Sequence, residues 1–178
     1  MPRSWVPALL GAAVVASAGS AKAFERQWHV GGGLGAATFA SGDPSLGPAL
    51  GVFGAYGLSD MFDARLELTA SRHERASGTS VDLYSASAGV AYKIDVIEWI
   101  PYVGLLLGYY RQAGEDPTSG DRGALGISTA LGIDYALSRS VGLGLQLRYH
   151  GGLNDVPTSL TDGSYYTGLL RAEYRWGW

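Results

Sequence analysis

The sequence alternates between apolar and polar positions through most of its length, with a period of two residues. The clearest stretch is 165–178, YYTGLLRAEYRWGW, in which even positions are mostly apolar and odd positions carry three charges. Side chains of a β-strand point alternately to opposite faces, so this period indicates strands with one apolar and one polar face. Eight such segments are predicted, at 27–39, 47–58, 62–73, 80–93, 101–111, 124–136, 141–150 and 165–178. Pro101 is expected at the first position of its strand, because proline donates no ladder hydrogen bond.

The connections between these segments alternate in length. Short links at 59–60, 95–99 and 138–140 are separated by longer polar stretches, of which 112–122 and 151–163 are the longest. Membrane barrels of bacteria have an even number of strands, short turns at one end and longer loops at the other. The pattern therefore predicts an all-β fold, an eight-stranded antiparallel up-and-down transmembrane β-barrel. Because unpaired backbone groups are costly in hydrocarbon, the last strand is expected to pair with the first.

Composition narrows the function classes. The chain has 178 residues, 27 glycines, no cysteine, 16% charged residues and a formal net charge of −3. The acidic balance and the scarcity of lysine argue against a nucleic-acid partner. Without cysteine there are no disulfides, thiolate metal sites or cysteine nucleophiles.

The first 23 residues have the composition of a secretory signal. Arg3 supplies a positive charge, 6–18 is apolar, and Ala21-Lys22-Ala23 fits a small-residue cleavage pattern. The apolar stretch is too short for a spanning helix, although an N-terminal anchor is the alternative. We therefore expect a cleavable signal peptide at 1–23 and the barrel at 24–178.

Alternation alone does not decide which face lies inside, because a soluble lipocalin-type barrel has the same period with an apolar interior. Glycine, alanine and serine dominate the polar face, which suits the narrow lumen of an eight-stranded barrel. The apolar face carries aromatic residues near strand ends, as in the two interfacial girdles of a membrane barrel. These residues are Trp28, Tyr56, Tyr84, Tyr92, Tyr109, Tyr135, Tyr149, Tyr166, Tyr174 and Trp176. Together with the signal segment, they favour a membrane barrel.

The polar face would place a set of ionisable side chains in the lumen. They are His29, Asp63, Arg65, Glu67, Lys93, Asp134, Arg148, Arg171, Glu173 and Arg175. Because an isolated buried charge is very unfavourable, these groups are expected to pair. Lys93 and Asp63 are expected to flank the same periplasmic turn and to form one such pair. The set is interpreted as a salt-bridged plug, since eight strands leave little free bore; an ion-lined pore is the alternative.

Motifs for catalysis are few. The glycines of 31–35 do not complete a nucleotide-binding fingerprint and no helix follows them. The pair His73-Glu74 is interpreted as a solvated pair at a strand end. Surface lipid A deacylases are also eight-stranded barrels and use a His-x-Ser arrangement, whereas this chain has His150-Gly151-Gly152 and so lacks the nucleophile at that position. Thr158 or Ser159 could approach from the following loop. No catalytic residue, metal site or cofactor is predicted.

The chain resembles the small outer-membrane β-barrel family, the OmpA-like, OmpX-like and porin-like group. The resemblance covers the whole mature chain and is carried by PYVGL at 101–105, YHGGL at 149–153 and YRWGW at 174–178. It implies residence in the outer membrane of a Gram-negative-type bacterium, with outer-membrane lipid and lipopolysaccharide as surroundings. It also implies that Tyr174, Trp176 and Trp178 form a C-terminal insertion signal for the barrel assembly machinery. The protein is expected to be a monomer.

Three function hypotheses follow. The first is a non-enzymatic barrel with a plugged lumen, whose outer loops 112–122 and 151–163 are its interaction surface, because loops on a rigid scaffold can vary their contacts. The second is a narrow porin-like channel for small solutes. The third is a lipid A-modifying enzyme, which the missing nucleophile disfavours.

Overall fold

The structure is a computed structural model of the 178-residue chain, and it describes residues 26–40, 46–74, 80–94, 98–114, 122–152 and 164–177. The expected signal segment 1–23, Trp178 and most of the expected outer loops lie outside these residues. The described part forms eight strands: β1 (Trp28–Phe39), β2 (Gly47–Gly57), β3 (Phe62–Glu74), β4 (Ser80–Lys93), β5 (Trp99–Gly114), β6 (Arg122–Ala136), β7 (Val141–Gly152) and β8 (Ser164–Trp176). In this part of the chain no helix is long and apolar enough to cross a membrane.

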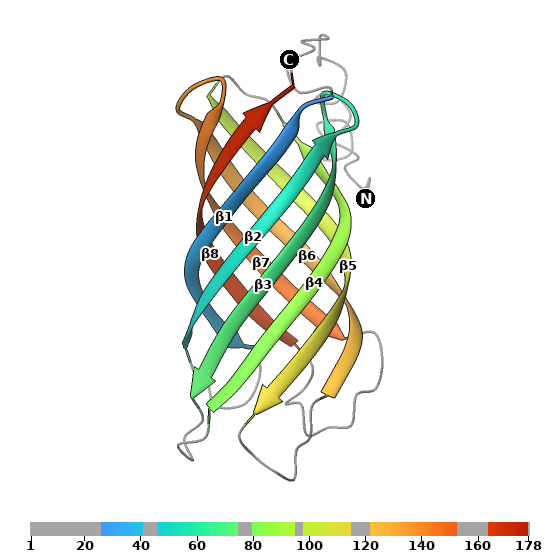
Figure 1. Ribbon diagram of the computed structural model, residues 1–178, viewed down its shortest axis with the longest axis vertical. Coiled ribbons are helices and arrows are strands. Elements are labelled where there is room, and N and C mark those ends of the chain that lie inside the picture. Colours follow the sequence, from blue (N-terminus) through green and yellow to red (C-terminus); the bar gives the residue numbers. More distant parts are fainter. Residues whose placement is uncertain are drawn as a thin grey trace, which may run out of the picture.

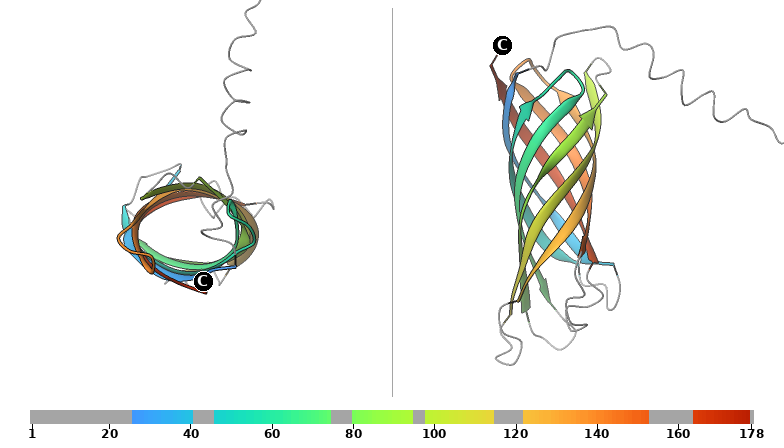
Figure 2. Two further views of the ribbon diagram at one scale, coloured as in Figure 1. Left: turned by 90° about the horizontal axis from the view of Figure 1, so that it is seen from above. Right: turned by 90° about the vertical axis from the view of Figure 1, so that its right-hand side faces the viewer.

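The eight strands close into one antiparallel barrel in which each strand pairs with its neighbours in the sequence (Figure 1). The strands are tilted and, seen along the barrel, enclose an elliptical ring (Figure 2). Closure is achieved by β1 and β8, whose pairing runs from Trp28 opposite Trp176 to Phe39 opposite Tyr165. This pairing of the last strand with the first confirms the sequence prediction and leaves no strand edge unpaired in the sheet.

The two ends of the barrel differ. We call the end at which β1, β3, β5 and β7 finish the loop end, and the end at which β8 finishes the turn end (Figure 1). Two tight turns at the turn end share one motif, in which a serine hydroxyl accepts backbone N–H bonds. Ser59 accepts from Phe62 at 3.1 Å, and Ser138 accepts from Val141 at 3.1 Å. Serine favours such turns because its hydroxyl bonds to the backbone a few residues away.

The fifth strand is longer than the sequence predicted. It begins at Trp99 rather than Pro101 and continues to Gly114, so Gln112 belongs to a strand and not to a loop. Pro101 is therefore not the first residue of its strand. Its carbonyl oxygen accepts the N–H of Ile94 at 2.9 Å, just past the end of β4. The N–H that proline lacks would point to the same side, where β4 has already ended. Its absence therefore removes no hydrogen bond between two strands.

The outward face of the barrel is an apolar band between two sets of aromatic side chains. Leucine, valine and isoleucine dominate the middle of the band, and many of these side chains are about half exposed. Neighbouring strands pair their aromatic residues, with ring centroids 4.8 Å apart for Trp28 and Tyr56 and 5.3 Å apart for Tyr149 and Tyr166. Trp99, which the sequence placed in a connection, joins the turn-end set, and its ring centroid lies 4.8 Å from that of Tyr135 in a tilted arrangement. Such an exposed apolar surface is what contact with lipid requires.

Candidate functional site

The candidate site is the interior of the barrel. All ten ionisable side chains that the sequence placed in the lumen point inward, and each is at most 7% exposed. The period of two explains this placement: every second residue of a strand faces inward, and the opposite face of the same strand is apolar. These side chains fall into a turn-end group and a middle group, and a separate aromatic layer lies at the loop end.

Lys93 and Asp63 form an ion pair in the turn-end group. The ammonium nitrogen of Lys93 lies 2.8 Å from a carboxylate oxygen of Asp63, and both side chains are buried. The sequence argument placed the two residues on either side of one turn, and this is wrong. Lys93 is the last residue of β4 and Asp63 is the second residue of β3, so Lys93 precedes one turn and Asp63 follows another. They meet because both lie at the turn end of adjacent strands.

Glu173 is the second centre of the turn-end group. Its carboxylate accepts a bond from the Nε of Arg175 at 2.6 Å and lies 3.6 Å from the Nδ1 of His29. Glu173 and Arg175 lie on β8 and His29 lies on β1, so the contact between His29 and Glu173 crosses the seam that closes the barrel. Asp134 extends from β6 over Gly144, where a side chain on that glycine would collide with the carboxylate. The turn end of the lumen thus holds buried side chains of both charges.

The middle group is centred on Glu67. Arg148 makes an ion pair with one carboxylate oxygen of Glu67, and the NH1 nitrogen of Arg65 lies 3.6 Å from the other. Arg148 also donates to the hydroxyl of Ser87 at 3.4 Å. Glu67 lies on β3 and Arg148 on β7, which are opposite each other in the closed strand order. The Arg148–Glu67 pair therefore spans the whole lumen.

Arg171 is held differently from the other interior cations. Its three guanidinium nitrogens have no hydrogen-bond partner among the described residues, and its guanidinium carbon lies 3.9 Å from the ring centre of Phe53. Arg65 lies in the same way over Tyr102, at 4.3 Å. A cation over an aromatic face is attracted by the ring quadrupole, more strongly when water is excluded. The expectation that every interior charge has an oppositely charged partner is therefore wrong for Arg171.

Two glycines make room for these aromatic rings. A β-carbon on Gly31 would collide with the ring of Phe53, and one on Gly132 would collide with the ring of Tyr102. Sequence reasoning did not single out Phe53 and Tyr102. The available signal was that both are large aromatic residues on the face otherwise occupied by small or polar side chains.

A small cavity lies beside Arg171 in the middle of the lumen. Glu67, Thr69 and Gln146 also line it, and it is just large enough for one water-sized molecule. The side-chain nitrogen of Gln146 has no hydrogen-bond partner among the described residues. Much of its lining is apolar, but the unpartnered nitrogens of Arg171 and Gln146 lie among the lining groups, so a water molecule there would accept hydrogen bonds from them.

The loop-end layer is aromatic. His150 stacks on Tyr165 with parallel rings whose centroids are 4.1 Å apart, and Tyr110 meets both rings edge-on. His150 Nδ1 lies 3.3 Å from the hydroxyl of Tyr110, and its Nε2 lies 3.1 Å from that of Thr167. Tyr165 packs with Leu169 and with small side chains of β1 and β2. Together these side chains form a compact layer across the lumen.

The His150 arrangement bears on catalysis. The histidine faces the lumen and is 1% exposed, and the hydroxyls beside it belong to Tyr110 and to Thr167, of which Thr167 is as buried as the histidine. His73 is also fully buried; its ring is tilted against that of Phe39, with centroids 4.4 Å apart, and its Nε2 lies 3.2 Å from the hydroxyl of Ser71. The interpretation of His73 as a solvated residue is therefore wrong. Thr158 and Ser159, the hydroxyls considered for His150, lie outside the described residues.

Metal chemistry finds no support in the part of the chain that the structure describes. No group of three or more His, Asp or Glu side chains there is arranged to hold a metal ion. The charged side chains of the lumen are instead engaged mainly with one another and with aromatic rings.

The sequence and the fold both match known proteins. The model of the outer membrane protein beta-barrel domain matches residues 7–171. The chain belongs to this family. It is therefore an outer-membrane protein of a Gram-negative bacterium, as the resemblance had implied. Its apolar band faces lipid, and the prediction of an eight-stranded membrane barrel is confirmed.

Solved structures of similar fold are outer-membrane barrels. The attachment invasion locus protein Ail of Yersinia pestis is 14% identical, with a TM-score of 0.62 over 85% of this chain and 99% of that one. Neisserial surface protein A is 22% identical, with a TM-score of 0.61 over 84% and 94%. The N-terminal barrel domain of OprF from Pseudomonas aeruginosa is 15% identical, with a TM-score of 0.62 over 85% and 98%. At these identities the likeness concerns the fold. No curated relative matches the chain by sequence.

Proposed function

We propose that this protein is a non-enzymatic outer-membrane barrel whose lumen is closed by its own side chains and whose loop end is its interaction surface. The observation that carries the proposal is the Arg148–Glu67 ion pair, which joins opposite strands across the lumen. A continuous path for ions would have to pass this pair. Eight strands enclose an interior that side chains just fill, so little space remains around it.

The loop-end layer supports closure independently. The stacked rings of His150 and Tyr165 lie on the loop side of Arg148, so a solute would meet two barriers in sequence. Leu106 and Ala130 are fully buried on β5 and β6, on the side of the lumen away from the seam. The interior is therefore packed with both apolar and charged groups.

The alternative is a narrow channel for small solutes. The cavity beside Arg171 is the feature that favours it, because a void in the lumen bordered by charged side chains could widen into a path when those side chains move. Swelling of proteoliposomes in a small sugar such as arabinose separates the two. Swelling no faster than in protein-free liposomes supports the plug; swelling that rises with the amount of folded protein supports the channel.

Lipid A modification is the third candidate. A hydrolase of this kind needs a hydroxyl activated by a base and open to the substrate. Here the histidines with hydroxyl neighbours, His150 and His73, are buried in the lumen, away from the lipid-facing surface. We therefore propose no catalytic role. A change in lipid A mass when the protein is overproduced in its membrane would overturn this.

The proposed partners follow from the location. Lipid and lipopolysaccharide surround the band, the assembly machinery inserts the barrel, and the barrel is a monomer. The central residues of the proposed interaction loops, 115–121 and 153–163, lie outside the described residues. Their strand-bound ends, such as Gln112 and Gly152, extend the barrel wall instead.

A further inference from the structure

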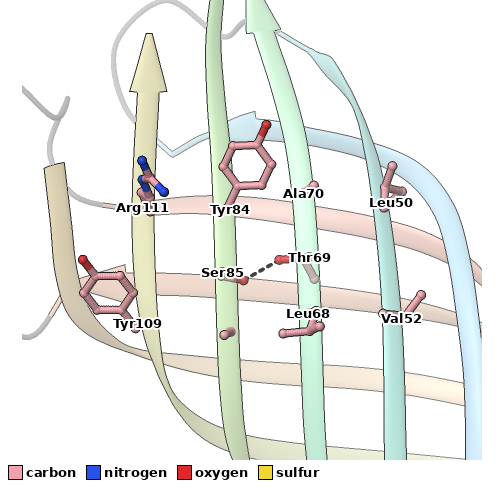
Figure 3. A pocket seen from close by; sticks show the side chains of 10 residues that line it. Leu50, Val52, Leu68, Thr69, Ala70, Tyr84, Ser85, Tyr109 and Arg111 are labelled. Carbon is pink, nitrogen blue, oxygen red and sulfur yellow. Dashed lines mark hydrogen bonds between the residues drawn. The ribbon is translucent and has the colours of Figure 1, made fainter. Parts of the chain in front are cut away.

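The lipid-facing surface has a groove across four strands, from β2 to β5 (Figure 3). Its floor is formed where Ala70 of β3 and Ala86 of β4 replace the large side chains usual on this face. Ala70 lies opposite Tyr84, and Ala86 lies between Leu68 and Tyr109 in the next cross-strand row. Small residues flanked by large ones on adjacent strands leave a hollow. Its volume of about 390 Å³ is within the range of roughly 300–1,000 Å³ typical of small-molecule sites.

The groove lies in the loop-end half of the band. Along β3 the outward-facing residues run from Phe62 at the turn end to Arg72, about ten residues further. With the tilt of a barrel strand, Arg72 lies about 25 Å from Phe62 along the barrel axis, at the loop-end boundary of the hydrocarbon. The loop end of an outer-membrane barrel faces the cell exterior. The groove therefore faces the outer leaflet.

Charge on the outward face is confined to the loop-end margin of this groove. Among the described strand side chains, those that are charged and face outward are Arg72, Asp82 and Arg111. Arg72 and Asp82 lie opposite each other with 3.7 Å between guanidinium and carboxylate. Arg111 lies opposite Tyr84 and lines the groove itself (Figure 3). The described outward faces of β6, β7, β8 and β1 carry no charged side chain, so among the described side chains the charged margin is specific to this sector.

We propose that the groove is a lipid site that holds one acyl chain of a phosphate-bearing lipid of the outer leaflet, with Arg111 binding the phosphate. The apolar floor suits a hydrocarbon chain, since its exposed lining is almost entirely apolar. A guanidinium matches a phosphate by paired N–H bonds, and the hydroxyls of Tyr84 and Tyr109 point toward the loop end (Figure 3). A peptide fits this place less well, because its backbone groups would lack partners in the hydrocarbon. The proposal does not depend on whether the lumen conducts.

Native mass spectrometry of the refolded full-length barrel in neutral maltoside micelles tests it. The probes are bisphosphorylated lipid A and the same lipid with its phosphates removed. We expect saturable binding of one molecule of the phosphorylated lipid. Ala86→Leu fills the floor and should weaken binding of both lipids. Arg111→Gln should weaken binding of the phosphorylated lipid by about tenfold or more and leave the other unchanged, since a charged hydrogen bond is lost.

Matched controls lie elsewhere on the same barrel. Ala172→Leu adds the same volume on the outward face of β8, and Arg139→Gln removes an exposed arginine at the turn end; both should bind lipid as the wild type does. Migration on an unheated gel verifies folding, and Ala70→Leu replaces Ala86→Leu if the latter fails to fold. Equal binding by the Ala86 and Ala172 variants would overturn the proposal. Equal binding of lipid A with and without its phosphates would also overturn the proposal. So would a mass signal for a dimer of the barrel that Ala86→Leu abolishes.

Discussion

Arg171 and Phe53 lie face to face inside the barrel, with the guanidinium carbon 3.9 Å from the ring centre. The two residues come from β8 and β2, on either side of β1, so their contact bridges the seam strand through the lumen. Because the guanidinium has no hydrogen-bond partner among the described residues, the ring is its principal stabilising neighbour.

Phe53→Leu should therefore destabilise the barrel by more than the loss of apolar contact alone. A double-mutant cycle with Arg171→Met, followed by urea unfolding in lipid vesicles, should give a coupling energy of about 2 kcal/mol. Phe62→Leu, on the outward face, is the control and should couple to Arg171→Met by less than about 0.5 kcal/mol. Equal coupling for both phenylalanines would refute the role of the ring.

The Lys93–Asp63 pair predicts a contrast between buried and exposed ion pairs. Lys93→Met leaves the fully buried Asp63 without its partner and should cost about 3–5 kcal/mol of unfolding free energy. The double variant Lys93→Met with Asp63→Leu should recover most of that loss. Arg72→Gln breaks an exposed pair and should cost less than about 1 kcal/mol. Urea unfolding measures all three, and a Lys93→Met variant as stable as Arg72→Gln would contradict the burial argument.

Two glycines test the seam between β1 and β8. A β-carbon on Gly35 would collide with the backbone carbonyl of Gly168, whereas a β-carbon on Gly168 would meet nothing within 4 Å. Gly35→Ala should therefore separate the strands and cost about 1–3 kcal/mol. Gly168→Ala should be neutral or slightly stabilising. The fraction of fast-migrating, folded barrel on an unheated gel, recorded against urea, reports both; the seam account fails if the two variants behave alike.

The insertion signal remains a prediction from the family resemblance. Replacing Tyr174 and Trp176 by serine should lower the amount of folded protein in the outer membrane several-fold. Replacing Tyr149 and Tyr166 by serine removes a comparable exposed aromatic pair from the other girdle and should leave insertion nearly unchanged. Quantitative immunoblots of membrane fractions make the comparison. Equal losses would mean that insertion depends on the aromatic side chains of both girdles and not on a signal in the last strand.

The sequence predicted the strands and the interior residues because both depend on a local period of two. Each of the ten ionisable residues faces inward because its neighbours on either side in the sequence are apolar and face lipid. This orientation can be predicted from the local sequence without knowing the partner strand. The contacts between them were harder to predict. Which residues meet across the lumen depends on the stagger of the whole barrel, and this places Glu67 against Arg148 and Arg171 against Phe53.

Strand ends were also incompletely predicted. Residues 95–99 were predicted to be a polar link because they include Asp95 and Glu98. In the structure Trp99 begins β5 and joins the aromatic girdle. His73 was predicted to be a solvated residue at the strand end because a glutamate follows it. In the structure β3 continues through His73, whose ring is buried against Phe39. In each case pairing with the adjacent strand extended the ladder beyond the point at which local composition changes. Tertiary context overrode the local signal.

Single-channel recording in planar bilayers tests the closed lumen most directly. If the proposed function holds, the refolded wild type should give no steady current steps, because ions would have to pass both the Arg148–Glu67 pair and the His150–Tyr165 layer. The double variant Arg148→Ser with Tyr165→Ala removes one group from each barrier and should conduct. Tyr166→Ala, on the outward face beside Tyr165, should remain silent. Steady steps from the wild type, at a frequency that follows the amount of folded protein, would contradict the account.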